Sequence, residues 1–552
     1  MKRWTLLCSA LVCSVALAAC QVTGGPDPAL SDPNIPHLQK RGTATQLIVD
    51  GKPFLALAGE LLNNSATSVE HMKPIWPKLV ETHFNTVLAG VSWAQIEPEE
   101  GKFDFKVLDG VIEAARRHNL RLVLLWFGSW KNGTSSYPPD WLKKDFERFP
   151  RAQATAGKSI EQLSSFSTAN RDADARAFAA LMRHVKQVDG SRHTVIMIQV
   201  ENEINGLDHS PPAAQALAGP VPRELMDYLQ SHKDTLTPEV RQVWEAAGFK
   251  TSGTWDEVFG KGGGADEIFS AWHYASYTGR VAAAGKAEYP LPMFANTWGE
   301  GFPKAGGRAN GAPKPSVIDV WRAGAPQIDM LCPDIYGGDF KGMCADYTRS
   351  GNPLFIPETG YVALNPAKAL FAFGHHDAIG FSPFGIDRED RLGSSPDLAG
   401  IYDMLARLAP LILDHQGDGT MAAVLMNATD PPQKINLGNY TLQVTFWPIR
   451  YTMPLQMPGE PPAGTPPPAA ALFIAAGPDE FFAIGSGVKV TFAPNSPGPP
   501  LAGLATVEQG TFVDGRWVPD IRLAGDDTGQ GADLFEIQRH MGIQRFTLYR
   551  YR

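Results

Sequence analysis

Two glutamates of this 552-residue chain stand just after short apolar runs, where parallel strands end and reacting groups are commonly carried. Glu203 follows Ile198-Gln-Val-Glu-Asn, and Glu358 follows Phe355-Ile-Pro. Two carboxyl groups delivered by distant strands suit hydrolysis of a glycosidic bond. That reaction needs a proton donor at the leaving oxygen and a second carboxylate at the anomeric carbon. A solvated loop position is the alternative for either glutamate alone, but their joint placement favours chemistry.

Composition excludes several other classes of function. Hydrophobic residues make up 43% and charged residues 19%, as in soluble globular proteins. The net charge of −9 is spread along the chain and leaves no basic stripe for nucleic acid. Neither a zinc-type Cys/His spacing nor a His-Glu-x-x-His run occurs, so we predict no catalytic metal and no cofactor.

The first twenty residues have the pattern of an export signal. Lys2 and Arg3 precede an apolar stretch that closes on Leu17-Ala-Ala-Cys20. This ending resembles the bacterial lipobox, which implies lipidation of Cys20; an ordinary secretory signal with a chance cysteine is the alternative. We predict a signal peptide over 1–20, a tether over 21–40, and location in the periplasm or outer membrane of a Gram-negative bacterium. The lipid would be the only contact with a membrane.

Eight short apolar runs alternate with helical patterns and predict a (β/α)₈ barrel over 41–418. Apolar stripes at 107–115 and 172–188 predict helices that pack on the sheet. A long insertion between the fourth and fifth runs contains helical patterns at 222–233, 238–248 and 265–286. The eight predicted strands are 54–59, 84–92, 120–127, 194–201, 291–296, 328–335, 353–357 and 378–384.

Beyond residue 418 the pattern changes to alternation of polar and apolar residues. Leu442, Val444 and Phe446 alternate, as do Val488, Val490 and Phe492. Such alternation is typical of antiparallel strands with one buried face. We therefore predict a β-sandwich over 419–552, with its role open: packing on the barrel, completing the pocket rim or binding polysaccharide.

The strand-end motifs resemble those of the family-35 β-galactosidases, whose fourth strand ends in Gln-Val-Glu-Asn-Glu, as residues 199–203 do here. The segment 92–105 is similar to the second-strand region of families 35 and 42. This resemblance implies that Glu203 is the acid/base, Glu358 the nucleophile and Asn202 a ligand of the sugar 2-hydroxyl. It also implies retention of configuration, with the two carboxyl groups about 5 to 5.5 Å apart.

Two neighbours of the pair carry separate predictions. Glu201 competes with Glu203, because strict alternation along a strand would point both side chains the same way. A bulge that breaks the pleat would let Asn202 and Glu203 both face the site. Tyr336 ends the sixth strand and is expected to donate a hydrogen bond to Glu358, with half-buried packing as its alternative.

Further candidates follow the other strands, and each has wall packing as its alternative. Aromatic rings stack on sugar faces, whereas amides and charges bind hydroxyl groups. The stretch 125–133 departs from its family-35 counterpart, and Tyr137-Pro-Pro-Asp-Trp-Leu142 is similar to family 42, so the reaction is predicted more firmly than the sugar. The candidates are Glu60, Asn64, Trp126, Trp130, Lys131, Asn132, Asn296 and Trp298.

The sequence thus predicts an exo-acting β-galactosidase that removes terminal β-D-galactosyl residues from oligosaccharides or plant polysaccharide side chains. The resemblance implies xyloglucan as the polymer. Two alternatives stay open: the same mechanism on a glucoside, xyloside or α-L-arabinopyranoside, and a surface lipoprotein that binds glycans without turnover. Cys332 and Cys344 could form a disulfide or remain buried thiols, and no oligomeric state is predicted.

Overall fold

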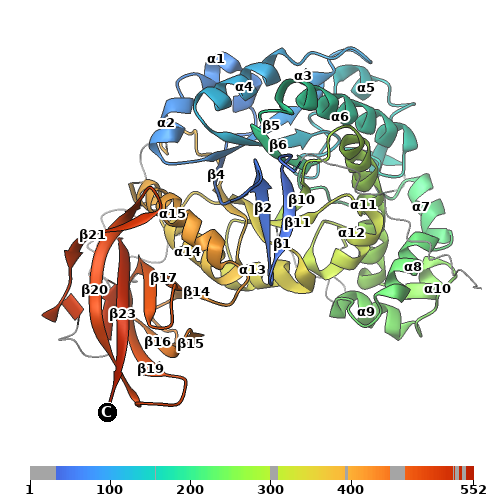
Figure 1. The fold of residues 1–552 in the computed structure, drawn as a ribbon. Helices are drawn as coiled ribbons and strands as arrows, with labels where there is room; N and C mark the ends of the chain where they lie inside the picture. Colours follow the sequence, from blue (N-terminus) through green and yellow to red (C-terminus); the bar gives the residue numbers. More distant parts are fainter. Residues whose placement is uncertain are drawn as a thin grey trace, which may run out of the picture.

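The structure is a computed structural model that describes residues 33–155, 157–298, 309–391, 396–447, 467–525, 527–528, 534–537 and 542–552. The predicted signal peptide, with Cys20, lies outside the described residues. Figure 1 shows a barrel surrounded by helices and a separate β domain at the C-terminal end of the chain.

Eight parallel strands close the barrel, in the order β10-β11-β12-β13-β4-β5-β6-β9, which confirms the predicted fold class. Each predicted apolar run overlaps one of these strands. They are buried on both faces, as expected for strands enclosed by helices. The strands are Ala56–Glu60 (β4), Thr86–Ser92 (β5), Arg121–Phe127 (β6), Val195–Val200 (β9), Met293–Trp298 (β10), Met330–Ile335 (β11), Phe355–Thr359 (β12) and Gly380–Pro383 (β13).

The helices around the barrel include those that the apolar stripes predicted. The long helix α6 starts where the Ser167 side chain accepts a hydrogen bond from Asn170 N, and it packs extensively on α11. The outer helices are Val69–Met72 (α1), Trp76–Glu81 (α2), Trp93–Ile96 (α3), Lys106–Arg117 (α4), Asp140–Lys144 (α5), Thr168–Asp189 (α6), Gly263–Glu288 (α11), Ile318–Gly324 (α12), Phe340–Thr348 (α13), Asn365–His376 (α14) and Pro396–His415 (α15).

Two insertions lie at the carboxyl ends of the strands. A hairpin of Arg151–Thr155 (β7) and Lys158–Leu163 (β8) precedes α6. The predicted helical insertion between the fourth and fifth barrel strands forms Pro211–Ala218 (α7), Arg223–Ser231 (α8), Pro238–Ala246 (α9) and Trp255–Phe259 (α10) before α11. These helices form a lobe at one side of the barrel (Figure 1).

A small antiparallel sheet precedes the barrel, made of His37–Arg41 (β1), Ala44–Val49 (β2) and Lys52–Phe54 (β3). Leu47 and Val49 of β2 pack with Ala56, Phe294 and other side chains near the starts of the barrel strands. The sheet therefore closes the amino-terminal end of the barrel, opposite the strand ends where Glu203 and Glu358 lie. Residues 37–40, predicted to belong to the tether, are part of β1.

The C-terminal region is a sandwich of two antiparallel sheets, as predicted. A six-stranded sheet has the order β14-β17-β18-β23-β20-β21, and a four-stranded sheet has the order β15-β16-β19-β22. The strands are Met421–Met426 (β14), Gln433–Leu437 (β15), Tyr440–Phe446 (β16), Ala469–Ala475 (β17), Glu480–Ser486 (β18), Val488–Pro494 (β19), Leu501–Val513 (β20), Arg516–Arg522 (β21), Leu534–Ile537 (β22) and Ile543–Tyr551 (β23). Val424, Leu442, Val490 and Phe546 belong to the core shared by the two sheets.

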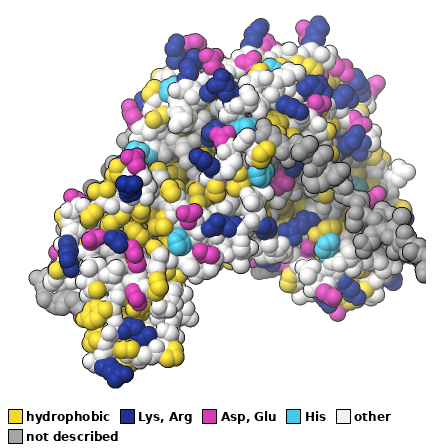
Figure 2. Space-filling model, in the orientation of Figure 1, with side chains coloured by type: hydrophobic (Ala, Val, Ile, Leu, Met, Phe, Trp, Pro, Cys, Tyr) yellow, Lys and Arg dark blue, Asp and Glu magenta, His cyan; other side chains and the backbone are white. Residues whose placement is uncertain are grey.

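The sandwich packs on the outer surface of the barrel through α14 and α15. Helix α14 contacts β14 and β17, and α15 contacts β20. Leu472 and Phe482 of the sandwich belong to the same buried cluster as Phe373 of α14. On the face shown in Figure 2, hydrophobic side chains gather where the β domain joins the barrel. Within the described residues, the helices are all too short or too polar to span a bilayer.

Candidate active site

The carboxyl ends of neighbouring barrel strands bring the candidate residues together. In the sheet register, Trp298 of β10 pairs with Asp334 of β11, and Asp334 pairs with Glu358 of β12. Strand β9 lies on the other side of β10 and ends at Val200, directly before the Glu203 segment. Because parallel strands end at the same edge, Glu203 and Glu358 meet at one rim of the barrel.

The backbone after β9 reverses its local handedness twice, at Glu201 (φ 63°) and at Glu203 (φ 47°). Left-handed backbone is costly for residues other than glycine, and it breaks the alternation of a strand. Glu201 and Glu203 therefore enter different surroundings although they are two residues apart. The predicted break in the pleat exists, formed by left-handed residues beyond the end of the strand.

Glu201 points into the barrel wall. Its Oε2 accepts a hydrogen bond of 2.7 Å from Trp130 N, and its carboxyl group hydrogen-bonds with Asp174 of α6. Asp174 in turn accepts hydrogen bonds from Ser129 and from Trp126 Nε1. Burial and then the charge of Asp174 raise the pKa of Glu201 well above its ordinary value. Glu201 is therefore a support for the loop after β6.

Glu203 lies among the other acidic groups of the rim. Burial and then the charge of Glu358 raise the pKa of the Glu203 carboxyl. Lys131 and hydrogen bonds with the Asp334 side chain and the Trp298 backbone act in the opposite direction. Glu203 N also donates to Asn296 Oδ1 over 3.3 Å, which fixes the turn that carries the glutamate.

Glu358 has the hydrogen-bond donor that the sequence predicted. The Tyr336 hydroxyl donates to Glu358 Oε1, which stabilises a carboxylate there. The pKa of Tyr336 is raised by burial and by the charge of Glu358, so the phenol keeps its proton for this bond. The ring of Tyr336 is 47% exposed, so it also borders the open side of the site.

Glu60 and Lys131 complete the charged cluster. Both are buried, at 2% and 6% exposure, and the charge of Lys131 lowers the pKa of Glu60, Glu203 and Asp334. Burial and then the charge of Glu358 nevertheless raise the pKa of Glu60 well above its usual range. No group of three or more histidine, cysteine, aspartate or glutamate side chains within the described ranges is arranged to hold a metal ion.

The side-chain amide of Asn202 is buried and makes no hydrogen bond to the described part of the chain. Neither Oδ1 nor Nδ2 has a hydrogen-bond partner among the described residues, although Asn202 N donates to Trp130 O. Buried amides are normally satisfied, and exceptions gather where a ligand completes the bonding. This agrees with the predicted contact to a sugar hydroxyl, which stays a prediction.

The tryptophans divide into two kinds. Trp126 and Trp130 are both 0% exposed: Trp126 donates to Asp174, and Trp130 packs edge-on against Tyr274 and Tyr277. Neither ring offers a face to a ligand, which corrects the prediction of a sugar-stacking role. Their aromatic bulk fills the wall behind Glu201. Trp298, by contrast, is 57% exposed at the end of β10 and keeps its predicted place at the rim.

The two remaining candidates are exposed asparagines near the rim. The Tyr137 hydroxyl donates to Asn64 Oδ1 over 2.9 Å, which ties the segment after β4 to the one after β6. Asn132 adopts left-handed backbone (φ 51°) in the turn directly after Lys131. Asn132 therefore has a turn-forming reason for its identity.

Two residues of the cluster were absent from the predicted site. Asp334 is 1% exposed and lies between Trp298 and Glu358 in the sheet. Asp387, after β13, accepts a hydrogen bond from Leu62 N and acts on the pKa of Glu60. Asp334 lies near the end of the predicted strand 328–335, two residues before Tyr336, and this placement could have revealed it. Asp387 lies in a loop with no such signal.

Cys332 and Cys344, the cysteines of the described part of the chain, are both buried free thiols, so a disulfide between them is excluded. Burial raises the pKa of the Cys332 thiol well above its ordinary value. Cys332 therefore serves as a small apolar residue of β11.

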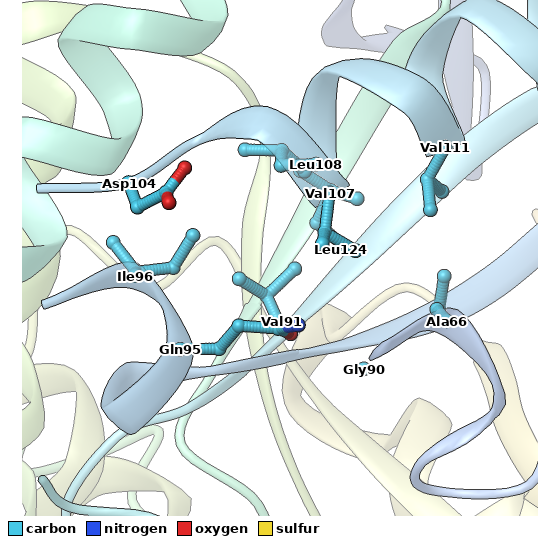
Figure 3. Close-up of a pocket in the computed structure, with 11 residues that line it drawn as sticks. Ala66, Gly90, Val91, Gln95, Ile96, Asp104, Val107, Leu108, Val111 and Leu124 are labelled. Atoms are coloured by element: carbon cyan, nitrogen blue, oxygen red, sulfur yellow. The ribbon is translucent and has the colours of Figure 1, made fainter. Parts of the chain in front are cut away.

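Cavities outside the carboxylate cluster differ in size. One of ≈ 20 Å³ lies between α4 and strands β5 and β6, where Figure 3 shows the apolar side chains of Val91, Ile96 and Leu108. It has room for about one water molecule and none for a sugar. A second, of ≈ 360 Å³, lies beside the loop that follows Glu203 and is lined by Gly206, His209, Phe269 and His273, among others.

Comparison with known proteins gives two family models that match parts of the chain. Residues 65–258 match the model Glyco_hydro_42, described as "Beta-galactosidase", and residues 398–535 match DUF5597, a domain of unknown function. The first contains β5, β6, β9 and Glu203. The second contains most of α15 and most strands of the sandwich.

Curated relatives resemble a shorter stretch. The β-galactosidase GalA of Bacillus licheniformis is 27% identical over 128 residues, and the β-galactosidase BgaA of Clostridium cellulovorans is 28% identical over 138 residues. The aligned stretches cover 23% and 24% of this chain and 18% of each relative. The crystal structure of a β-galactosidase from Bacillus circulans sp. alkalophilus has a TM-score of 0.45 at 16% identity, covering 65% of this chain and 57% of that one.

These matches correct the family that the motifs suggested. The family-35 resemblance is wrong, because the model that matches the N-terminal part of the barrel is that of family 42. Gln-Val-Glu-Asn-Glu is a short motif, and the similarity of 92–105 and 137–142 to family 42 was the better guide. Residues 65–258, which include β5, β6, β9 and Glu203, carry the family-42 pattern.

Proposed function

We propose that this chain is a retaining glycoside hydrolase that removes terminal β-D-galactosyl residues. The observation that carries the proposal is the pairing of unlike carboxyl groups at one rim. The charge of Glu358 helps to raise the pKa of Glu203, and Tyr336 donates to Glu358. Environments that keep one carboxyl protonated and stabilise the other as a carboxylate are those of a general acid and a nucleophile.

In the first step Glu358 attacks the anomeric carbon while the proton of Glu203 passes to the leaving oxygen, and the glycosidic C–O bond breaks. In the second step Glu203 takes a proton from water, the water oxygen attacks the same carbon, and Glu358 departs. A carboxyl separation of about 5 to 5.5 Å belongs to this proposal. Asn202 binds the 2-hydroxyl group, where a hydrogen bond strengthens as the transition state forms.

Galactose is proposed because the relatives that match are named β-galactosidases. We assign stacking on a sugar face to Trp298, which is exposed, and binding of hydroxyl groups to Lys131 and Glu60. The cavity beside the loop that follows Glu203, of ≈ 360 Å³, has room for further sugar units of a longer substrate. A branched oligosaccharide or a plant polysaccharide such as xyloglucan is therefore the proposed class of substrate.

Nitrophenyl β-glycosides of galactose, glucose and xylose, together with nitrophenyl α-L-arabinopyranoside, test the reaction and the sugar together. We expect the highest kcat/KM with galactose. E358Q should abolish turnover, and E203Q should cost about 10² to 10⁴ in rate with poor leaving groups but less with nitrophenol, which needs little protonation.

The matched control is E239Q. It removes the charge of Glu239 in α9, which forms an ion pair with Arg349. It should leave the rates unchanged. Wild-type turnover in both E203Q and E358Q would contradict the assignment. Sugar binding without turnover by the wild type would favour a glycan-binding protein instead.

Export and a lipid anchor at Cys20 are also part of the proposal, supported by the Leu17-Ala-Ala-Cys20 pattern. Full-length protein expressed in a Gram-negative host should fractionate with membranes, and C20A should appear in the soluble periplasmic fraction. Equal distribution of the two proteins would contradict the anchor.

A further inference from the structure

Asp334 occupies the middle of the carboxylate cluster without an assigned part in the reaction. It lies in β11, paired in the sheet with Trp298 on one side and Glu358 on the other, and is 1% exposed. A buried aspartate at the carboxyl end of a barrel strand needs an explanation, because an unpaired carboxylate is expensive to bury.

Asp334 reaches Glu203 by two routes. Asn296 Nδ2 donates to Asp334 Oδ2 over 2.8 Å, while Asn296 Oδ1 accepts from Glu203 N over 3.3 Å. A side-chain hydrogen bond with Asp334 also lowers the pKa of Glu203. One route holds the backbone of the acid/base residue, and the other holds its carboxyl group.

The direct bond requires a proton between the two carboxyl groups, since two carboxylates are acceptors only. Asp334 Oδ1 is buried and has no donor among the described residues, which is costly for an ionised oxygen and natural for one that carries a proton. Burial, followed by the charges of Glu358, Glu203 and Glu60, raises the pKa of Asp334 well above its usual range. The titratable groups that interact with Asp334 are Glu60, Lys131, Glu203, Tyr336, Glu358, Cys332 and Tyr347.

We propose, building on the proposed function, that Asp334 is a positioning residue that keeps its proton throughout the reaction and donates a hydrogen bond to Glu203. When Glu203 has given its proton to the leaving group, this bond stabilises the resulting carboxylate. Because Asp334 remains neutral, it adds no charge beside Glu358, whose carboxylate must attack. The bond also holds Glu203 in one orientation while its protonation state changes.

The amide of asparagine reproduces a protonated aspartate. In D334N the carbonyl oxygen can still accept from Asn296 and the amide nitrogen can still donate to Glu203. We therefore expect D334N to keep kcat within about threefold of the wild type, whereas D334A should lose about 10² in kcat through misplacement of Glu203. In D334A the basic limb of the kcat/KM profile should also move to higher pH, since the Glu203 carboxylate has lost a donor. In D334N that limb should stay in place.

D319N is the control for replacing a buried aspartate by its amide. Asp319 accepts hydrogen bonds from Thr237 N and Oγ1 in the lobe, and its loss should change thermal stability without moving the pH profile. Equal losses of kcat in D334N and D334A would overturn the proposal, because they would mean that an ionised Asp334 is required. Wild-type rates and pH profile in D334A would overturn it as well.

Infrared spectroscopy detects the proposed proton on Asp334 and does not require the protein to be active. The difference spectrum between wild type and D334N near neutral pH should contain the C=O stretch of a protonated carboxylic acid, and the bands of a carboxylate in its place would overturn the proposal. If the wild type proved inactive, only the proposed function would be contradicted. The infrared spectrum would still show whether Asp334 carries a proton. If D334A does not fold, the spectrum and the rate of D334N decide between the outcomes.

Discussion

At the scale of single residues, chemically identical side chains of the site differ in their contacts because their surroundings differ. Glu201 and Glu203 are chemically identical, yet one hydrogen-bonds with Asp174 inside the wall and the other interacts with Glu358, Asp334 and Lys131 at the rim. The carboxyl group that can reach a ligand is the one whose pKa depends on the partner carboxylate. Function follows from these neighbours more than from the identity of the residue.

The pKa of Glu203 gives a prediction for the pH dependence of activity. Glu203 must be protonated to act as an acid, and its pKa is raised from the ordinary value of 4.5. A raised pKa keeps the acid form at higher pH, so kcat/KM should remain high above pH 4.5 and fall only as pH rises through the shifted value. Rates measured at intervals between about pH 4 and 9 report this limb. A profile that has already fallen to half near pH 4.5 would contradict it.

Tyr336 gives a second prediction. Y336F removes the hydroxyl that donates to Glu358 but keeps the ring, so kcat should fall about 10- to 100-fold, as expected for loss of a hydrogen bond to a charged group. Y440F is the matched control, since Tyr440 donates to Asp479 in the C-terminal domain. Its steady-state rates should equal those of the wild type. Equal rates for Y336F and Y440F would show that the bond to Glu358 is dispensable.

Residue types predicted the acid pair and Tyr336 because each directly follows a recognisable strand. The same reasoning failed for Trp126 and Trp130, because a pattern of strand ends does not tell which side of the wall a ring faces. Asp334 was passed over although it precedes Tyr336 in the same strand end. Its importance depends on contacts with Asn296 and Glu203 that arise only when three strands close together.

At the scale of elements, the end of β9 is the critical feature. Strand geometry would send Glu201 and Glu203 the same way, and the left-handed backbone at both residues prevents this. The hydrogen bond from Trp130 N to Glu201 ties this irregular segment to the loop after β6. The strain of the turn is thus held by contacts in the wall, as is common near reacting groups.

The buried pair of Glu201 and Asp174 gives a prediction for stability. The pKa of Glu201 is raised in the folded state, so the folded protein binds the proton more tightly than the unfolded chain. This contribution is fully present below pH 4.5 and is lost as pH rises through the folded pKa, at about 1.4 kcal/mol per pH unit. E201Q cannot ionise, so its melting temperature should decline less with rising pH.

Thermal melts of wild type and E201Q over a series of pH values measure this effect. E113Q, which removes an exposed glutamate of α4, controls for the loss of one charge. Parallel melting curves for wild type and E201Q would show that Glu201 carries no proton in the folded state.

The elements themselves were largely predictable. The eight buried strands appear in the sequence as apolar runs. Helices α8, α9 and α11 lie where helical patterns predicted them. The sheet of β1 to β3 was not expected, because its short and partly exposed strands carry little periodicity. The same reason applies to the hairpin of β7 and β8.

At the scale of the whole molecule, the β domain packs on the outer surface of the barrel, against α14 and α15. Gly374 of α14 is a point of close approach: a Cβ there would lie 2.7 Å from Ala423 Cβ and 2.7 Å from Leu472 Cγ. Of the three roles left open for this domain, packing on the barrel is the one that these contacts support.

G374A should therefore destabilise the protein by about 1 to 3 kcal/mol through overpacking of the junction. G400A is the matched control, because Gly400 of α15 has open space around its Cβ position and alanine favours a helix by up to about 1 kcal/mol. Melting temperatures should move in opposite directions. A shift in the same direction for both would mean that the junction is loosely packed.

The central claim is that Glu203 and Glu358 act from opposite faces of one sugar in a double displacement. The most direct measurement is the anomer that the wild-type enzyme first releases from an aryl β-galactoside, followed by proton NMR before mutarotation. Two inversions at the anomeric carbon return the starting configuration, so we predict that β-galactose appears first. Initial release of α-galactose would mean direct attack by water, with Glu358 acting as a base, and would contradict the account.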